Sequence, residues 1–389
     1  MRSFDVAVIG GGIVGASVAL ALRGADVSVA WIEPQAHVAP ARASEWDNRI
    51  YALTPGNAEW LTQLGVWQRV PQERVAPVET MRIFGDRPQG YLEFDTYSAG
   101  LRELAFIVEN SAVLHALWEA LEGAEHVSAL RPATCAEVRW EQDRAVLGLA
   151  DGSELQAQLV VGADGADSWV RREAGIPSRI YDYHQVGVVA NFECARPHDG
   201  TAFQWFRADG VLALLPLPGN RTSMVWSTAT EHAHELTRLT PDDLAATVEN
   251  ASAGVLGTLR LITPAAGFPL KRQRVARLVE PRAALVGDAA HNVHPLAGQG
   301  LNLGLRDVRA LSAVLASRGP VSDCGDYCLL RRYERARRED ILALELTTDG
   351  LQKLFANPAV WLAGLRNFGL SLVNRQPPLK NLLIRHAAA

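Results

Sequence analysis

The chain has 389 residues, of which 48% are hydrophobic and 21% are charged, and its formal net charge is -5. This length allows more than one hydrophobic core, and we expect two domains. The composition is that of a folded globular protein and excludes extensive disorder. The acidic balance argues against a nucleic-acid binder, which would need a broad basic surface.

The cysteines and the N-terminus exclude several further classes of protein. Four scattered cysteines do not form a disulfide framework, and Cys324 and Cys328 lack the second pair or nearby His that a metal site needs. We therefore expect no metal. The chain enters a strand pattern at Phe4, which leaves no room for a signal peptide. No run of about 20 apolar residues lacks charge, so we expect a cytoplasmic protein without a membrane-spanning helix.

The first 33 residues predict a strand, a glycine-rich turn, a helix and a second strand. Gly10, Gly12 and Gly15 form G-x-G-x-x-G. Gly10 permits the turn, Gly12 lets the backbone approach a pyrophosphate, and Gly15 lets the helix pack closely on the strand. Glu33 ends the second strand, where it can accept both hydroxyls of an adenosine ribose. This pattern predicts an unphosphorylated ADP moiety, as in FAD or NAD.

Two later junctions repeat this strand-to-helix logic. An apolar strand pattern ends in Gly162-Ala163-Asp164-Gly165, and another ends in Gly287-Asp288 before a loop with Pro295, Gly298 and Gly300. A glycine-bearing loop that leads into a helix presents backbone N–H groups to negative ligands. Because the carboxyl ends of parallel strands meet at one edge of a sheet, we interpret both junctions as ligand contacts.

Two polar residues near these junctions have open interpretations. Arg49 follows the second strand and either neutralises a phosphate or is a solvated surface side chain. Asn110 precedes an amphipathic helix, where local evidence favours a residue of the N-cap region.

Residues 184–230 read as successive strands separated by glycine-containing turns, which predicts an antiparallel sheet inserted into the first domain. The fold class is therefore α/β, with a discontinuous Rossmann-like domain, an inserted mainly antiparallel β-sheet domain for substrate and a helical C-terminus. The expected boundaries are 1–75, 100–175 and 270–325 for the first domain, 76–99 and 176–269 for the second, and 326–389 for the C-terminal region.

The C-terminal residues from Leu351 onward are basic and strongly apolar, with no Asp or Glu. Such a helical segment lies on an anionic membrane surface, packs on its own domain or forms a subunit interface. All three alternatives stay open, and the subunit interface would make the protein a homo-oligomer.

The whole chain resembles the FAD-dependent aromatic hydroxylases (class A flavoprotein monooxygenases), and more narrowly the ubiquinone-biosynthesis hydroxylase family. The resemblance rests on three ordered motifs. They are G-x-G-x-x-G with Glu33, the Gly162–Gly165 "DG" motif, and Gly287-Asp288-Ala289-Ala290-His291 continuing into the run His294-Pro295-Leu296-Ala297-Gly298-Gln299-Gly300-Leu301. The last run is the most specific to the family.

The resemblance implies a role for each motif residue toward FAD. Gly10, Gly12 and Gly15 hold the pyrophosphate, and Glu33 holds the adenosine ribose. The other implied FAD contacts are Arg49 at the phosphates, Asp164 and Gly165 near the docked nicotinamide, Asp288 at the ribityl or pyrophosphate region, and Gly298, Gln299, Gly300 and Leu301 under the isoalloxazine ring. Asn110 replaces an Arg or Gln of many relatives, and we place it among the flavin-side candidates.

The implied reaction is hydroxylation of a polyprenyl phenol of ubiquinone biosynthesis by NAD(P)H and O2, through a C4a-hydroperoxyflavin. A second G-x-G-x-x-G is missing, so NAD(P)H is expected to dock transiently. His291, His294 and Pro295 are the catalytic candidates, with structural hydrogen bonding as the alternative for both histidines. The substrate candidates are apolar residues of the inserted sheet, about half of which should face away from the ligand, namely Phe203, Trp205, Leu212, Leu214 and Trp226.

Other functions compete with this one. The first is a different flavoenzyme reaction on the same fold, either hydroxylation of a small soluble phenol or a reductase reaction. The second is halogenation, against which the missing W-x-W-x-I-P motif counts. The third is a non-catalytic binding protein that retains the fold. It would be colourless when purified, because it would lack the bound FAD that absorbs visible light. The implied location is the cytoplasm or the surface of the inner membrane, alone or in a multienzyme assembly.

Overall fold

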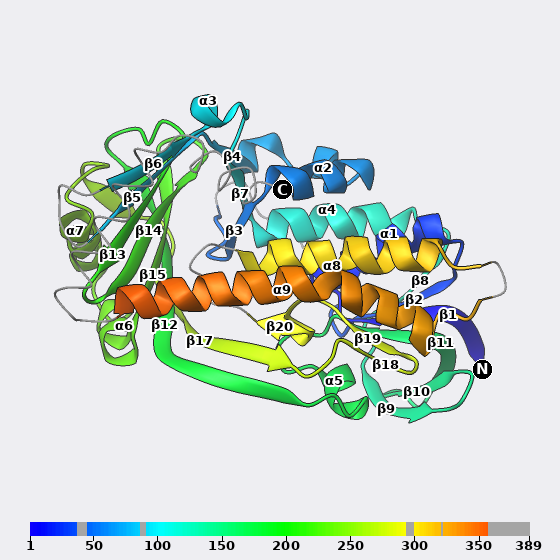
Figure 1. Ribbon diagram of the computed structural model, residues 1–389. Coiled ribbons are helices and arrows are strands. Elements are labelled where there is room, and N and C mark those ends of the chain that lie inside the picture. Colours follow the sequence, from blue (N-terminus) through cyan, green and yellow to red (C-terminus); the bar gives the residue numbers. More distant parts are fainter. Residues whose placement is uncertain (37–44, 86–90, 293–298, 320–321, 357–389) are drawn as a thin grey trace.

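The computed structural model describes residues 1–36, 45–85, 91–292, 299–319 and 322–356 (Figure 1). Within these ranges the chain forms three sheets. The first has eight strands in the path β18-β19-β11-β1-β2-β8, with the antiparallel strands β10 and β9 added beside β11. Its strands are β1 (Arg2–Ile9), β2 (Val29–Ile32), β8 (Val127–Leu130), β9 (Cys135–Trp140), β10 (Ala145–Leu149), β11 (Glu154–Gly162), β18 (Val279–Glu280) and β19 (Ala283–Leu285).

The centre of this first sheet is parallel. β1 pairs in parallel with β2 on one side and with β11 on the other, and β11 pairs in parallel with β19. Val6, Ala7 and Val8 in β1 are completely buried, which explains why their run is continuously apolar: helices or loops cover both faces of the strand. The Rossmann-like α/β fold is confirmed.

Four helices cover this sheet on the side seen in Figure 1. α1 packs against α4 and α8, and α9 packs against α8 and runs alongside it (Figure 1). Their bounds are α1 (Ile13–Ala21), α4 (Asn110–Glu122), α8 (Gln299–Ala316) and α9 (Tyr327–Ala356). The remaining α-helices are α2 (Pro55–Gln63), α3 (Thr96–Ala99), α5 (Trp169–Glu173), α6 (Thr230–Leu236) and α7 (Pro241–Ala251), and the 3-10 helices span Leu22–Ala25, Trp67–Arg69, Gln72–Arg74 and Gly287–Ala289.

The second sheet is the inserted one and has nine strands, in the path β20-β17-β12-β15-β14-β13-β5-β6 with β16 beside β12. All its pairings are antiparallel except β13 with β5. Its strands are β5 (Thr80–Phe84), β6 (Tyr91–Asp95), β12 (Ser178–Cys194), β13 (Thr201–Arg207), β14 (Gly210–Leu217), β15 (Arg221–Ala229), β16 (Leu259–Leu261), β17 (Ala266–Val275) and β20 (His291–Asn292). The predicted antiparallel insertion is confirmed.

Two connections tie the inserted sheet to the first one. β12 and β17 form a long ribbon that runs along the lower side of Figure 1, and β20, which follows the Gly287 turn, pairs with the end of β17. A small third sheet, of β3 (Ile50–Leu53), β7 (Ala105–Glu109) and β4 (Val75–Val78), packs between the two larger sheets.

The C-terminal region begins with the long helix α9, and residues 357–389 lie outside the described ranges. The membrane interpretation begins at Leu351, so only its first residues, to Ala356, belong to α9, and the rest lies outside the described ranges. Across the parts of the chain that are described, no helix is both long and apolar enough to cross a membrane.

Candidate functional site

The three glycine-bearing junctions pack against one another around Val14, the second residue of α1. A Cβ on Gly287 would lie 3.1 Å from Val14, and one on Gly304 of α8 would lie 2.8 Å from it. A Cβ on Gly10 would lie only 2.4 Å from the carbonyl oxygen of Ala163 in the DG junction. These glycines allow the backbones of all three junctions to approach closely. The junctions therefore form one unit rather than three separate turns.

Gly12 differs from these packed glycines. It is the N-cap residue of α1, with φ -65°, and a Cβ there would meet no atom within 4 Å. The fold alone does not need a glycine at this position. Open space before the N–H groups of a helix N-terminus suits a pyrophosphate, which needs the backbone to come close.

Glu33 lies at the end of β2, as predicted, and is buried. Its Oε2 accepts a hydrogen bond from Gly11 N at 2.5 Å, and its Oε1 accepts one from Gln35 N at 2.8 Å. A carboxylate has about four acceptor sites, so both oxygens can still accept from a ribose hydroxyl. The acid is thus oriented for the adenosine end of FAD before a ligand arrives.

The DG junction holds an acceptor that the protein does not use. Asp164 accepts from Val170 N at 3.0 Å through Oδ2, but its buried Oδ1 has no partner in the described part of the chain. Gly165 has φ +84°, a conformation that favours glycine. A buried acceptor without a donor is costly, which fits a ligand that donates to Asp164.

Arg171 connects the DG junction with the Gly287 turn, and the sequence analysis missed it. The buried guanidinium donates to Ala289 O at 3.1 Å and to Ala166 O at 2.8 Å. Only its position in α5, just after the DG junction, marks it in the sequence. Because its partners are backbone carbonyls far apart in the chain, no motif could identify it.

Arg49 lies near Asp288, so the structure brings these two predicted residues together. Burial raises the pKa of the Asp288 carboxyl, and the nearby positive charges of His291 and Arg49 oppose this rise. The Arg49 guanidinium also lies 5.6 Å from the centre of the Tyr51 ring and is exposed. An exposed cation beside the Gly287 turn is well placed to neutralise a phosphate.

Asn110 is the first residue of α4, and its N–H donates to Arg49 O at 2.8 Å. The N-cap position itself belongs to Glu109, whose side chain makes no capping bond. Asp47 caps this helix instead, because its carboxylate accepts from Ser111 N at 3.1 Å. The expectation that Asn110 belongs to the N-cap region is correct to within one residue, whereas the capping side chain comes from a distant loop.

The environment of His291 favours the structural alternative over a catalytic role. It is 2% exposed, and its Nε2 lies 2.6 Å from Oδ2 of the fully buried Asp307 in α8. Burial alone would lower the pKa of His291, but Asp307 outweighs burial and the net shift is upward. An ionised carboxylate can only accept, so Nε2 carries the proton that it donates to Asp307. The geometry supports the alternative role in structural hydrogen bonding.

The remaining residues of this loop are only partly described. His294, Pro295 and Gly298 lie outside the described residues. Gln299 and Gly300 are half-buried at the start of α8, and Leu301 is buried. The predicted helix is present but begins at Gln299, two residues earlier than the pattern from Leu301 indicates, so Gly300 belongs to the helix and not to the loop. Its N-terminal N–H groups are presented at this point.

The substrate candidates of the inserted sheet face the wrong side. The five candidates are Phe203, Trp205, Leu212, Leu214 and Trp226. All five belong to one buried cluster on the face away from the third sheet, together with residues of α6 and α7 such as Leu236 and Leu244. Strand side chains alternate, and the bulkiest apolar residues pack beneath the covering helices. We therefore correct their assignment from substrate contacts to core residues.

The opposite face of the sheet turns toward the Arg49 loop. Ala202 and Leu215 pack against Ile50 there, and Asn191 Nδ2 donates to Asp47 O at 3.0 Å. The side chains that share this face by alternation are small or polar and include Val189, Gln204, Ala213, Ser223 and Val225. Val189, Ala213 and Val225 are only half-buried, unlike the helix-covered face.

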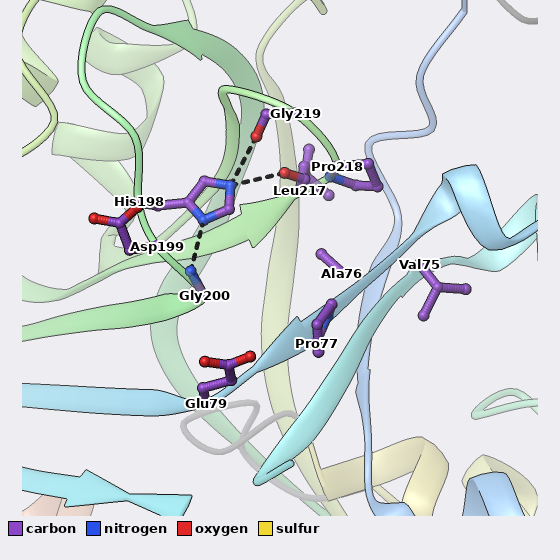
Figure 2. A pocket seen from close by; sticks show the side chains of 10 residues that line it. All are labelled: Val75, Ala76, Pro77, Glu79, His198, Asp199, Gly200, Leu217, Pro218 and Gly219. Atoms are coloured by element: carbon purple, nitrogen blue, oxygen red, sulfur yellow. Dashed lines mark hydrogen bonds between the residues drawn. The ribbon is translucent and has the colours of Figure 1, made fainter. Parts of the chain in front are cut away.

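A pocket of about 550 Å³ lies at the edge of the third sheet, away from every predicted site residue (Figure 2). His198 dominates its polar lining. The ring Nε2 lies 2.8 Å from Leu217 O and 2.9 Å from Gly219 O, and Nδ1 accepts from Gly200 N at 3.2 Å. Both nitrogens are thus used to hold two turns together, and the ring has no capacity left for catalysis.

A comparison with known proteins decides the family. A family model described as an FAD binding domain matches residues 3–345. The chain belongs to this FAD-binding family. Its identity to the ubiquinone hydroxylase UbiL of Rhodospirillum rubrum is 36% over 387 residues, which cover 98% of this chain and 89% of that protein. Its identity to 3-demethoxyubiquinol 3-hydroxylase of Escherichia coli is 35%, with 98% of each protein covered.

Among solved structures, p-nitrophenol 4-monooxygenase PnpA from Pseudomonas putida matches with a TM-score of 0.80, covering 99% of this chain and 98% of that one. At 18% identity this match shows the fold alone. Together the comparisons confirm the predicted resemblance and FAD as the cofactor, and this member of the FAD-binding family is a monooxygenase. Three features of the described residues fit FAD. They are the open space at Gly12, the orientation of the Glu33 carboxylate and the buried Asp164 oxygen without a protein partner.

Proposed function

We propose that this monooxygenase hydroxylates the aromatic ring of a polyprenyl phenol of ubiquinone biosynthesis, with NAD(P)H and O2 as co-substrates. The observation that carries the substrate is the end-to-end similarity to proteins named for ubiquinone hydroxylation. The shared identity of 35–36% extends over 98% of this chain, so it includes the inserted sheet as well as the FAD-binding elements.

Bound FAD supplies the redox chemistry and the activation of O2, and the protein supplies position and charge. We assign Gly10, Gly12 and Gly15 to the pyrophosphate, Glu33 to the adenosine ribose and Asp288 to the ribityl chain. Arg49 neutralises phosphate charge. The N-terminus of α8, from Gln299 to Leu301, faces the ring, where its N–H groups stabilise negative charge.

The substrate lies, in this proposal, between the flavin elements and the open face of the inserted sheet. Val189, Ala213 and Val225 give an apolar wall that excludes water from the reacting ring. Gln204 is the polar group on this wall whose amide hydrogen-bonds the phenolic hydroxyl. Gln204 is 7% exposed, so such a bond forms in a site of low dielectric constant.

The proposal extends to parts that the described residues do not reach. NAD(P)H docks transiently near Asp164 and Gly165. His294, Pro295 and Gly298 keep their assigned places beside the flavin ring, and Asn110 stays a flavin-side candidate. The enzyme works at the cytoplasmic surface of the inner membrane, where a polyprenyl substrate resides, through the basic apolar residues that follow Leu351.

The test is a comparison of two substrates by product mass. Purified holoenzyme receives NAD(P)H, O2 and either a polyprenyl phenol in detergent or a small soluble phenol of the same ring. We expect a product heavier by one oxygen atom only from the polyprenyl phenol. Turnover of the small phenol alone would transfer the assignment to the soluble-phenol hydroxylases. Deletion of the gene should cause a ring-unhydroxylated ubiquinone precursor to accumulate.

A further inference from the structure

One buried carboxylate joins the flavin-side turn to two helices. Asp307 of α8 is 0% exposed, and its Oδ2 accepts from both Gly287 N at 3.0 Å and His291 Nε2 at 2.6 Å. Its Oδ1 accepts from Arg337 Nε of α9 at 2.8 Å. Arg337 is 4% exposed and also donates through Nη1 to Asp340 at 2.6 Å. Three donors from two chain segments, the Gly287–His291 turn and α9, therefore meet at Asp307 of α8.

These contacts fix the turn that carries Asp288. Gly287 and His291 flank it on either side, and both are held by Asp307. Arg171 holds the middle of the turn at Ala289 O. A turn fixed at both ends and in the middle offers the Asp288 carboxylate in one direction, so little conformational entropy is lost when a ligand binds.

The charge on Arg337 is what permits Asp307 to stay ionised in this position. An isolated buried carboxylate is strongly unfavourable, and it is tolerated when it is paired and hydrogen-bonded. His291 is one partner and Arg337 is the other. Loss of the guanidinium would weaken Asp307 as an acceptor for Gly287 N and His291, and the turn would lose its anchor.

A second contact from the same helix supports this arrangement. The Tyr333 hydroxyl, one helical turn before Arg337, donates to Leu285 O at 2.8 Å, and Tyr333 is completely buried. Leu285 ends the strand that leads into the Gly287 turn. Helix α9 therefore holds the strand directly and the turn through Asp307.

We propose that Arg337 is a positioning residue for the FAD site, which acts through Asp307 on the Gly287–His291 turn without touching FAD. This assigns a cofactor role to α9, a helix that lies outside the motifs of the FAD-binding fold and that carries none of the predicted site residues. Asp307 and His291 transmit the effect, and Asp288 receives it.

The test compares three variants of the full chain. R337M removes the charge and both hydrogen bonds, R337K keeps the charge on a single donor nitrogen, and R338M alters an exposed neighbour on the same helix. Each apoprotein is titrated with FAD, and the thermal midpoint is measured with and without saturating FAD. We expect R337M to weaken FAD binding by about 10- to 100-fold, by analogy with other groups that orient ligand-binding residues. R337K should lie between R337M and wild type, and R338M should match wild type.

The shift in thermal midpoint on adding FAD separates positioning from general stability. Ligand binding raises the stability of the folded state by an amount set by affinity, so weaker binding reduces this shift. A lower midpoint of the R337M apoprotein with an unchanged FAD-induced shift and unchanged affinity would overturn the proposal. If R337M does not fold, R337K decides: weakened FAD binding supports the proposal, and wild-type affinity overturns it.

Discussion

Gly12→Ala separates the needs of the fold from those of the cofactor. A Cβ at Gly12 would meet no protein atom within 4 Å, and the backbone there has φ -65°, which alanine adopts without strain. The apoprotein should therefore fold with nearly wild-type stability. The methyl group would occupy the space through which a pyrophosphate approaches α1. Overpacking of this kind costs about 1–3 kcal/mol, or roughly 5- to 150-fold in FAD affinity.

Two other glycines give matched controls for this variant. Gly24→Ala also introduces a methyl group into open space, but outside the site, so FAD affinity should not change. Gly15→Ala would place a Cβ 2.1 Å from Gly10 O and should destabilise the apoprotein itself. The assays are urea unfolding of each apoprotein and FAD titration by flavin fluorescence. Wild-type FAD affinity in Gly12→Ala would refute the assignment of this turn to the pyrophosphate.

Three further predictions concern the ribose, the substrate wall and pH. Glu33→Gln should weaken FAD binding by about 1.5–3 kcal/mol, the usual value of a hydrogen bond to a charged group. The same FAD titration measures this change, and unchanged affinity would contradict the ribose role. Gln204→Leu should lower kcat/KM for the phenol while FAD affinity stays constant. Trp205→Phe, on the other face of the sheet, should change thermal stability alone, so steady-state kinetics distinguish the two faces. For pH, burial alone would raise the pKa of Asp307, but His291 and Arg337 outweigh it and the net shift is downward, while the pKa of His291 is raised. The stabilisation from this pair is therefore complete between pH 3.8, the ordinary pKa of Asp, and pH 6.5, the ordinary pKa of His. It is lost as the pH falls through the lowered pKa of Asp307, and also as the pH rises through the raised pKa of His291. Urea midpoints across pH should follow this profile, and Asp307→Asn should flatten it; an equally pH-dependent variant would disprove the coupling.

The ligand-binding junctions could be predicted because their signals are local. A strand, a glycine turn and a helix follow one another within about twenty residues, and each glycine has a steric reason that sequence spacing reveals. Gly10 and Gly12 illustrate the limit of this method. Both belong to one motif, yet only the structure shows that packing requires Gly10, whereas Gly12 faces open space and is not needed by the fold itself.

The supporting residues could not be predicted, because their partners lie far away in the chain. Arg171 and Arg337 bind backbone or side-chain atoms that the fold brings together, and Asp47 caps a helix that begins 63 residues later. Arg337 lies in a run of charged residues on α9, and its burial within that run leaves no mark in the sequence. Such contacts depend on tertiary packing, which periodicity does not specify.

The substrate face was predicted on the wrong side for a related reason. Alternation shows which side chains share a face but not what covers that face. Large aromatic residues such as Trp205 and Trp226 suggested a pocket for an aromatic ring, yet they fill the core under α6 and α7. The residues of the opposite face, such as Ala213 and Gln204, are small or polar, and it is this face that we propose for the substrate.

The central claim is that this protein transfers one atom of O2 to the ring of a polyprenyl phenol. The most direct measurement supplies ¹⁸O2 and NAD(P)H to the purified holoenzyme with such a phenol and follows the product by mass spectrometry. We predict a hydroxylated ring that carries one ¹⁸O atom. Consumption of NAD(P)H with H2O2 as the sole oxygen product, or a hydroxyl group derived from water, would contradict it.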